Sequence, residues 1–203
     1  FNGGSQLSVN GAELPFTTTH ISAATGLVAW SLVETWRGGK PTAVGMATGA
    51  VAGLVGITPG AGFVTPAAGM AIGAITGLLC YFSVQLKVSL RFDDSLDTFA
   101  VHGVGGTIGA ILTGVFASAE LISSHPAGQV LAENGRFALI GGQFQAVLVA
   151  YGLAALGTLL IAAVLRGLGM PFRVPEEAEN LGVDVREHGE EAYAERIGSP
   201  QFH

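Results

Sequence analysis

Hydrophobic and polar positions follow one another in long blocks along this chain. The stretches that lack Asp, Glu, Lys and Arg are residues 14–33, 41–57, 64–86, 98–119 and 137–165. Uncharged runs of about 17–25 residues match a bilayer core that is about 30 Å thick. The helices of a soluble bundle would each carry a polar face, and these stretches have none. The pattern predicts an all-α membrane protein with about five spans in residues 1–165 and a tail in residues 166–203.

The basic residues predict how these spans are oriented. If the first span enters the cytoplasm, the outer segments contain only Arg136, and the cytoplasmic segments contain Arg37, Lys40, Lys87, Arg91, Arg166, Arg173, Arg186 and Arg196. This distribution follows the positive-inside rule. We therefore expect a multi-pass protein of the inner or plasma membrane, with its start outside and its tail in the cytoplasm.

Composition narrows the possible functions. Only 12% of the residues are charged and the net charge is −6, without the basic clusters that nucleic-acid binding requires. The sequence has no nucleophile elbow, no HExxH and no P-loop lysine, and its histidines lack metal-ligand spacing. We expect no enzymatic activity, cofactor or metal. Cys80 is the single cysteine and lies in a predicted span, so an intrachain disulfide is excluded.

Glycines and prolines punctuate the predicted spans. GMATGAVAG and GMAIGAITG place glycines four residues apart, which lets helix backbones approach closely in lipid. GVGGTIG resembles a dinucleotide-binding loop but has neither a preceding strand nor an acidic partner. ITPGAGFVTP should interrupt the helix on the outer side, with Thr58 as either a turn hydroxyl or a cavity-lining one. The run 137–165 is longer than the bilayer core requires, so it should tilt or extend into the cytoplasm.

His102 is the residue most suggestive of chemistry. It lies among glycines in FDDSLDTFAVHGVGG, inside a predicted span where ionisable groups are uncommon. A neutral imidazole there has one donor and one acceptor nitrogen, and it could accept a hydrogen bond from a small amine. We expect the glycines to leave room beside it. The alternative is a packed histidine that is bonded to a carbonyl.

The other ionisable groups have simpler interpretations. Asp93, Asp94 and Asp97 precede the span of His102, where carboxylates interact favourably with the helix dipole, and Ser95 or Asp97 could cap the first amides. The remaining histidines are His20, expected at the membrane interface, and His125 and His188, expected to be solvated, together with the terminal His203. The acidic tail is either a disordered end or a docking segment for a cytoplasmic partner.

Several motifs, in order, resemble the ammonium transporter family (Amt/Mep). FNGGS is similar to the family's FNAGS, and RGGKPTAVGMATGAVAGLVGITPGAGFV, RFDDSLDTFAVHGVGG and RVPEEAENLGVDVREHGEEAY are similar to its later motifs. The resemblance covers essentially the whole chain and implies the second half of an eleven-span fold. That half is the second inverted repeat plus the last helix. FNGGSQLSV would then be the end of an earlier span of a longer protein.

The resemblance also implies roles for particular residues. Phe1 would be one of two stacked gate phenylalanines, Ser5 a hydroxyl that recruits ammonium at the outer mouth, and His102 one of two pore histidines. Thr58 would border the outer part of the pore. The tail would carry regulation by PII-type signal proteins through Glu176, Glu177, Asp184, His188, Gly189, Glu190 and Tyr193. The second pore histidine and the outer gate would lie in the missing half.

The implied function is transport of ammonium or ammonia, with methylammonium as an analogue. Ammonium would be recruited at the outer mouth and deprotonated on passage through an apolar pore, in a homotrimer surrounded by lipid. Two alternatives stay open at this point. One is an ammonium sensor that signals through its tail, and the other is a Rhesus-type ammonia channel, which EHGEEAY and VHGVGG disfavour.

Overall fold

A computed structural model of the protein describes residues 1–5 and 9–190. The regular elements of the described residues are all helices, without a strand. The chain divides into two compact units, Phe1–Ala150 and Tyr151–His203. The boundary between them falls inside one helix, and the start of a cytoplasmic tail at residue 166 stays a prediction.

Each predicted apolar stretch coincides with a helix of the structure. In order they are α2 (Glu13–Gly38), α3 (Ala43–Ile57), α4 (Pro66–Ser89), the pair η1 (Phe99–Gly103) and α5 (Val104–Phe116), and α6 (Pro126–Gly167). A short helix, α1 (Asn2–Ser5), precedes them. The helix α4, the continuous helix Phe99–Phe116 and α6 are long and apolar enough to cross a membrane, and α3 is apolar but shorter.

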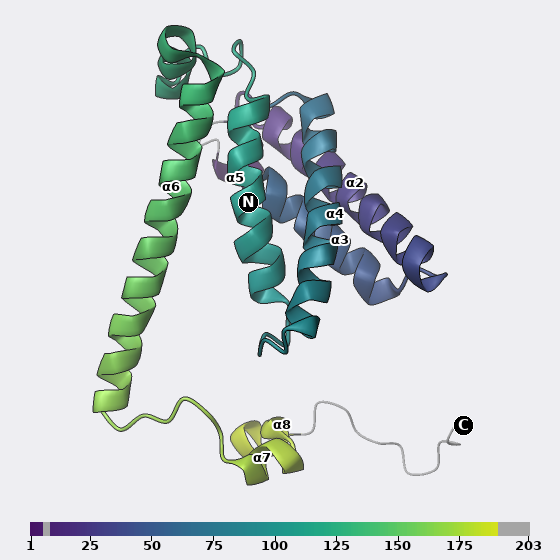
Figure 1. Cartoon of the computed structure of the whole chain (residues 1–203), viewed down its shortest axis with the longest axis vertical. Coiled ribbons are helices and arrows are strands. Elements are labelled where there is room, and N and C mark those ends of the chain that lie inside the picture. Colours follow the sequence, from purple (N-terminus) through teal and green to yellow (C-terminus); the bar gives the residue numbers. More distant parts are fainter. Residues whose placement is uncertain (6–8, 191–203) are drawn as a thin grey trace. The chain divides into compact units, whose positions relative to one another are not determined.

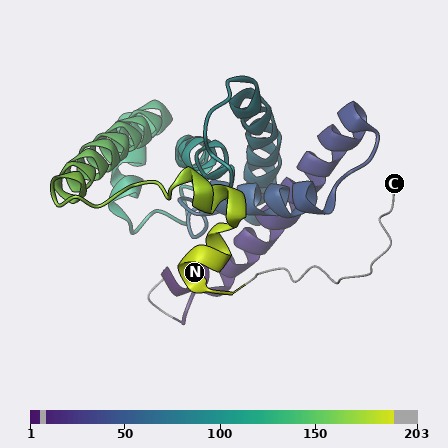
Figure 2. The ribbon, with the colours of Figure 1, turned by 90° about the horizontal axis from the view of Figure 1, so that it is seen from below.

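The helices α2, α3 and α4 pack against one another (Figure 1). Their contacts are made through glycines, as the sequence predicts. A Cβ at Gly53 in α3 or at Gly73 in α4 would overlap the carbonyl oxygen of Ser22 in α2. One helix therefore approaches two others closely, and α2 and α3 cross in the view of Figure 2. Such close approach suits association in lipid, where helices gain little from hydrophobic burial against one another.

Polar side chains of α2 add hydrogen bonds to these contacts. The Thr18 hydroxyl donates to the carbonyl of Ala61 (2.7 Å), Ser22 donates to Gly53 (2.8 Å) and Thr25 donates to Met70 (3.0 Å). Thr18 and Ser22 are completely buried. The polar residues in the first half of α2 thus tie three helices together.

The connections are fixed by caps. Thr42 caps α3 by accepting from Gly45 N–H (2.9 Å) and donating to Glu34 of α2 (2.9 Å). The chain leaves the α-helical spiral at Ile57 and re-enters it at Pro66, so ITPGAGFVTP interrupts the helix as predicted. The helix α6 contains a break at Gly135, whose φ is 78°, and the predicted run 137–165 lies beyond this break.

Arg136 also caps a helix. Its guanidinium donates to the carbonyl oxygens of Gly114 (3.3 Å) and Ala117 (2.6 Å) at the end of α5. A cation there satisfies carbonyls without helical partners and interacts favourably with the helix dipole. The single basic residue of the predicted outer segments therefore has a structural role.

Candidate functional site around His102

His102 lies in a π-helical turn. In η1 the N–H of Val104 bonds to the carbonyl of Phe99, five residues earlier, before the chain continues as the α-helix α5. Such single-turn π segments hold one extra residue and are frequent at functional sites. In the sequence, the glycines around His102 are compatible with irregular backbone, but they do not predict a π turn.

The turn places His102 away from the packed interior. Its neighbours Ala100 and Val101 are 1% and 3% exposed, and Val101 belongs to a buried cluster with Trp30, Cys80 and Tyr81, whereas His102 is exposed in this chain. The glycines near His102 have different roles. A Cβ at Gly105 would meet Cys80 Sγ at 3.0 Å, and a Cβ at Gly103 would meet the ring of Phe99 at 2.8 Å. Gly103, Gly105 and Gly106 were expected to leave room beside His102, but only at Gly106 would a Cβ have no atom closer than 3.9 Å.

His102 lines an open apolar hollow of about 450 Å³. Its walls come from the chain start, α3 and the η1–α5 helix, and consist of Phe1, Val51, Leu54, Val55, Thr58, Pro59, His102 and Gly106. Three of the four residues predicted to line a pore therefore meet at one surface although they are far apart in the sequence. The Thr58 hydroxyl donates to the carbonyl of Leu54 (2.7 Å), so its oxygen has only acceptor capacity left for a ligand.

The chain start forms a second wall. Phe1 is 97% exposed and also lines a neighbouring hollow with Phe16 and His20. Asn2 donates from Nδ2 to the hydroxyl of Thr19 (2.8 Å), which attaches α1 to α2. Ser5 ends α1, and its side chain lies outside the described part of the structure, so its predicted role stays a prediction.

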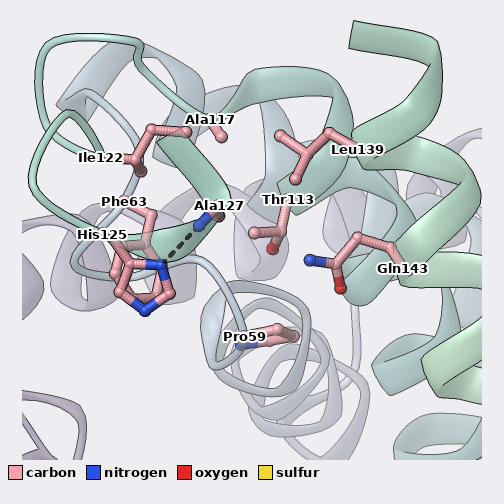
Figure 3. Close-up of a pocket in the computed structure, with 9 residues that line it drawn as sticks. All are labelled: Pro59, Phe63, Thr113, Ala117, Ile122, His125, Ala127, Leu139 and Gln143. Atoms are coloured by element: carbon pink, nitrogen blue, oxygen red, sulfur yellow. Dashed lines mark hydrogen bonds between the residues drawn. The ribbon is translucent and has the colours of Figure 1, made fainter. Parts of the chain in front are cut away.

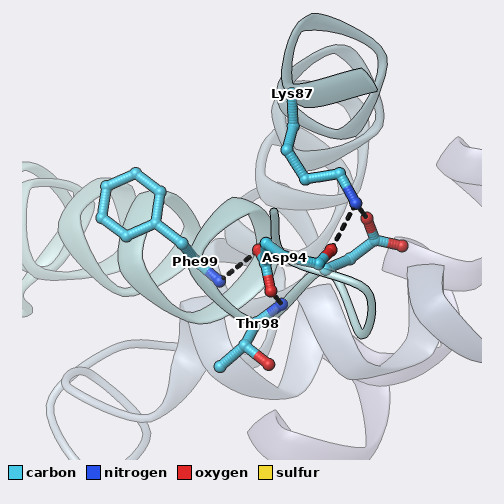
Figure 4. Close-up of polar contacts among 5 residues, drawn as sticks. Lys87, Asp94, Thr98 and Phe99 are labelled. Carbon is cyan, nitrogen blue, oxygen red and sulfur yellow. Dashed lines mark hydrogen bonds and ion pairs between the residues drawn. The ribbon is translucent and has the colours of Figure 1, made fainter. Parts of the chain in front are cut away.

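The acids before His102 form a compact polar cluster (Figure 4). Asp94 accepts from the amides of Thr98 (2.8 Å) and Phe99 (2.9 Å), so it caps the helix where we expected Ser95 or Asp97. Asp97 instead pairs with Lys87 of α4, and Lys87 also donates to the carbonyl of Asp94 (2.6 Å). Which acid caps the helix depends on the path of the loop before it, and a local sequence pattern does not reveal that path.

The cluster sets the ionisation of Asp94. Loss of hydration acts to raise the pKa of this carboxyl, but the amide hydrogen bonds from Thr98, Phe99 and Ala100 and the charge of Lys87 outweigh it, so the pKa lies below its ordinary value of 3.8. The ionised cap therefore stabilises the fold above that pH, and this contribution is lost as the pH falls through the lowered pKa.

We expect Asp94→Asn to lower the melting temperature of the detergent-solubilised protein at pH 7. The difference from wild type should shrink as the pH is lowered below 3.8, because the wild-type cap then loses its charge. Melting curves from pH 3 to pH 8 measure this. Glu133→Gln on α6 is the control, and a difference that is constant over this range would contradict the assignment.

The structure also contains a small, partly open cavity that the sequence did not suggest (Figure 3). It has a volume of about 70 Å³ and lies where α5, the following loop and the start of α6 meet. Figure 3 shows Thr113 and Gln143 directed toward one another in this cavity. His125, expected to be solvated, is exposed but packs on Phe63 with ring centroids 5.2 Å apart, and its Nδ1 accepts from Ala127 N–H (3.2 Å).

Comparison with known proteins identifies the family. The sequence model of the Ammonium Transporter Family matches residues 1–193. The chain belongs to the ammonium transporter family. It is 42% identical over 199 residues to an ammonium transporter of Bacillus subtilis (strain 168), which covers 97% of this chain and 48% of that protein. The chain thus spans about half the length of the curated relatives it matches.

Solved structures agree with this assignment. A structure titled Sensor Amt Protein has a TM-score of 0.77 and 34% identity, and the match covers 92% of this chain and 44% of that one. Mep2 of Saccharomyces cerevisiae has a TM-score of 0.57 and 36% identity, and the match covers 69% of this chain and 33% of that one. The fold is therefore about half of an ammonium transporter fold, as the sequence motifs predicted.

In this member of the ammonium transporter family, the tail forms two short helices. They are α7 (Glu176–Leu181) and α8 (Val183–His188). Glu176 and Glu177 lie in the first turn of α7, and Asp184 lies in the first turn of α8, where acids favour the helix dipole. His188 ends α8 and Gly189 follows in the left-handed conformation (φ 71°), which is a common helix end. Glu190 is exposed, and Tyr193 lies outside the described residues.

Proposed function

We propose that this chain supplies one half of a transmembrane conduit for ammonium or ammonia. Support comes from the family and from one observation above all: Phe1, Thr58 and His102 come from three separate segments and line the same apolar hollow. A ligand at this surface would touch mostly aliphatic and aromatic groups. The imidazole is the titratable group among its walls.

The hollow favours a small neutral amine over a hydrated cation. An ion that enters apolar surroundings loses its hydration, which costs far more than burying a neutral polar molecule. Ammonium would therefore transfer its proton to solvent water at the mouth of the hollow, which breaks one N–H bond and forms hydronium, and ammonia would pass His102 as a neutral molecule. A neutral imidazole offers ammonia one acceptor and one donor, so passage is guided without a buried charge.

The remaining roles follow the same proposal. Ser5 would bind ammonium at the outer mouth, Phe1 would narrow the entrance, and Thr58 would offer its oxygen as an acceptor. The intact protein would be a homotrimer in the inner or plasma membrane, with the start of this chain outside and its tail in the cytoplasm. The tail would bind a PII-type signal protein. Uptake of radiolabelled methylammonium by cells that express the intact protein, with competition by ammonium, tests the conduit directly.

A second candidate function is sensing, which the similarity to the protein titled Sensor Amt Protein favours. In a sensor, ligand occupancy would be signalled through the tail, and flux would be secondary. In that case α7 and α8 would be the signalling element, because the acids in their first turns place negative charge at defined positions for a cytoplasmic partner.

Truncation after Arg166 separates these two functions. If the protein is a transporter with a regulatory tail, we expect the truncated form to alter the rate or regulation of methylammonium uptake. If it is a sensor alone, the nitrogen response should disappear while uptake per protein is unchanged. Uptake and a nitrogen-responsive reporter should be measured in the same cells, with membrane content determined by immunoblot. Unchanged values for both would contradict a role for the tail.

A further inference from the structure

A lysine and two aspartates connect α4 to the π turn, and we call Lys87, Asp94 and Asp97 the acid–lysine latch. Lys87 is in the last turn of α4, and its side chain is only 14% exposed. It pairs with Asp97 and holds the carbonyl of Asp94, while the Asp94 carboxylate binds the first amides of the helix that carries His102. The latch therefore fixes the start of that helix.

The other end of the π turn is fixed by packing. Val101 is 3% exposed within its cluster, and Gly105 lies against Cys80 of α4. The extra residue of the π turn is thus held between two anchors. Relaxation to an α-helical turn would remove that residue and rotate one side of the turn by about 100° relative to the other. Either the capped amides or His102 would have to move.

The backbone of the latch has a conformation that suits its residues. Asp97 has a φ of 55°, in the left-handed region, and its carbonyl accepts from Val101 N–H (2.9 Å). Asp and Asn adopt this region more readily than other residues with a side chain. Asp97→Asn therefore keeps the backbone and removes the charge, which makes it a clean test of the ion pair.

We propose that the acid–lysine latch holds the π turn in register and thereby positions His102 on the hollow, so that Lys87 and Asp97 are positioning residues for transport. This inference rests on the proposed function, since it assigns a purpose to the position of His102. Its structural content is independent of flux, because the position of the imidazole can be measured without transport.

The experiment compares Lys87→Met, Asp97→Asn, the double variant and Lys87→Arg in the intact protein. Two readouts are needed: methylammonium uptake per membrane-inserted protein, and the rate at which diethyl pyrocarbonate modifies His102, followed by peptide mass spectrometry. His20 serves as the internal reference for modification, and Lys40→Met is the matched control because Lys40 lies in an exposed connection outside the latch.

We expect each single variant to change uptake by about tenfold, as for a lost hydrogen bond to a charged group. The modification rate of His102 should change relative to His20. The double variant should add little to Lys87→Met, because that variant already removes both the ion pair with Asp97 and the hydrogen bond to the carbonyl of Asp94. Lys87→Arg should retain most activity. Variants that lower only the protein yield or melting temperature, with His102 reactivity unchanged, would overturn the inference.

The failure of this inference can be distinguished from failure of the proposed function. If His102→Ala leaves uptake unchanged, the conduit proposal fails, whereas the modification rate still decides whether the latch positions the ring. If His102→Ala alters uptake but the latch variants change neither readout, only the inference fails.

Discussion

Replacing His102 by Ala in the intact protein is expected to impair methylammonium uptake or change its selectivity, while the protein still reaches the membrane. The imidazole is exposed to an apolar hollow and is the one titratable side chain among its walls. Alanine offers neither the donor nor the acceptor nitrogen of the ring, and two lost hydrogen bonds at about 1 kcal/mol each correspond to a rate that is lower by roughly 30-fold. Uptake of labelled methylammonium, normalised to protein in the membrane, measures the loss, and inhibition by other monovalent cations measures selectivity.

Two further variants give this result its meaning. His102→Gln keeps a donor and an acceptor but does not titrate, so it separates hydrogen bonding from proton acceptance. His125→Ala is the matched control, because His125 lies at the separate small cavity and its ring is also exposed. Equal uptake and selectivity in His102→Ala and in wild type would contradict a pore role for this residue.

A second large effect is expected from Gly109→Ala in α5. A Cβ at this position would overlap the carbonyl oxygen of Gly56 in α3, so the two helices would have to separate. Overpacking of this kind typically costs about 1–3 kcal/mol. Gly109 lies two turns beyond His102. Separation of α3 and α5 would therefore also displace the helices that line the hollow. We expect a lower melting temperature and less monodisperse protein after solubilisation.

Gly141→Ala is the control for this experiment. Gly141 lies in α6, is helical and has no atom within 4 Å of a Cβ placed there. The substitution should be neutral or stabilising, because Ala favours helices over Gly by about 1 kcal/mol. Melting curves of both variants, recorded in the same detergent by tryptophan fluorescence, decide the matter. Equal destabilisation at the two positions would show that close approach is not the cause.

Much of the fold could be predicted from the sequence. The five uncharged stretches each coincide with a helix, and the glycines at spacing four are the residues on which α2, α3 and α4 cross. The break at ITPGAGFVTP was also predicted correctly, because proline and glycine end helices by local chemistry. The location of the domain boundary and the orientation in the membrane stay predictions.

The candidate site was predictable only in part. His102, Phe1 and Thr58 were selected from motifs, and the structure brings them to one hollow. The roles of the acids that precede His102 could not be predicted from the sequence motifs. Asp94 is the cap and Asp97 the partner of Lys87, since both depend on a loop whose path is set by α4.

The sequence by itself determined membrane residence, the helical class and the family, because the transfer of uncharged residues into lipid and the motif matches are nearly additive along the chain. Only the tertiary structure decided that His102 lies in a π turn, that its two preceding neighbours are buried, and that three distant segments share one hollow. These features arise from contacts between helices. The close approach of the helix backbones and the one extra residue in the π turn determine which side of the His102 helix faces the hollow. No local pattern contains that information.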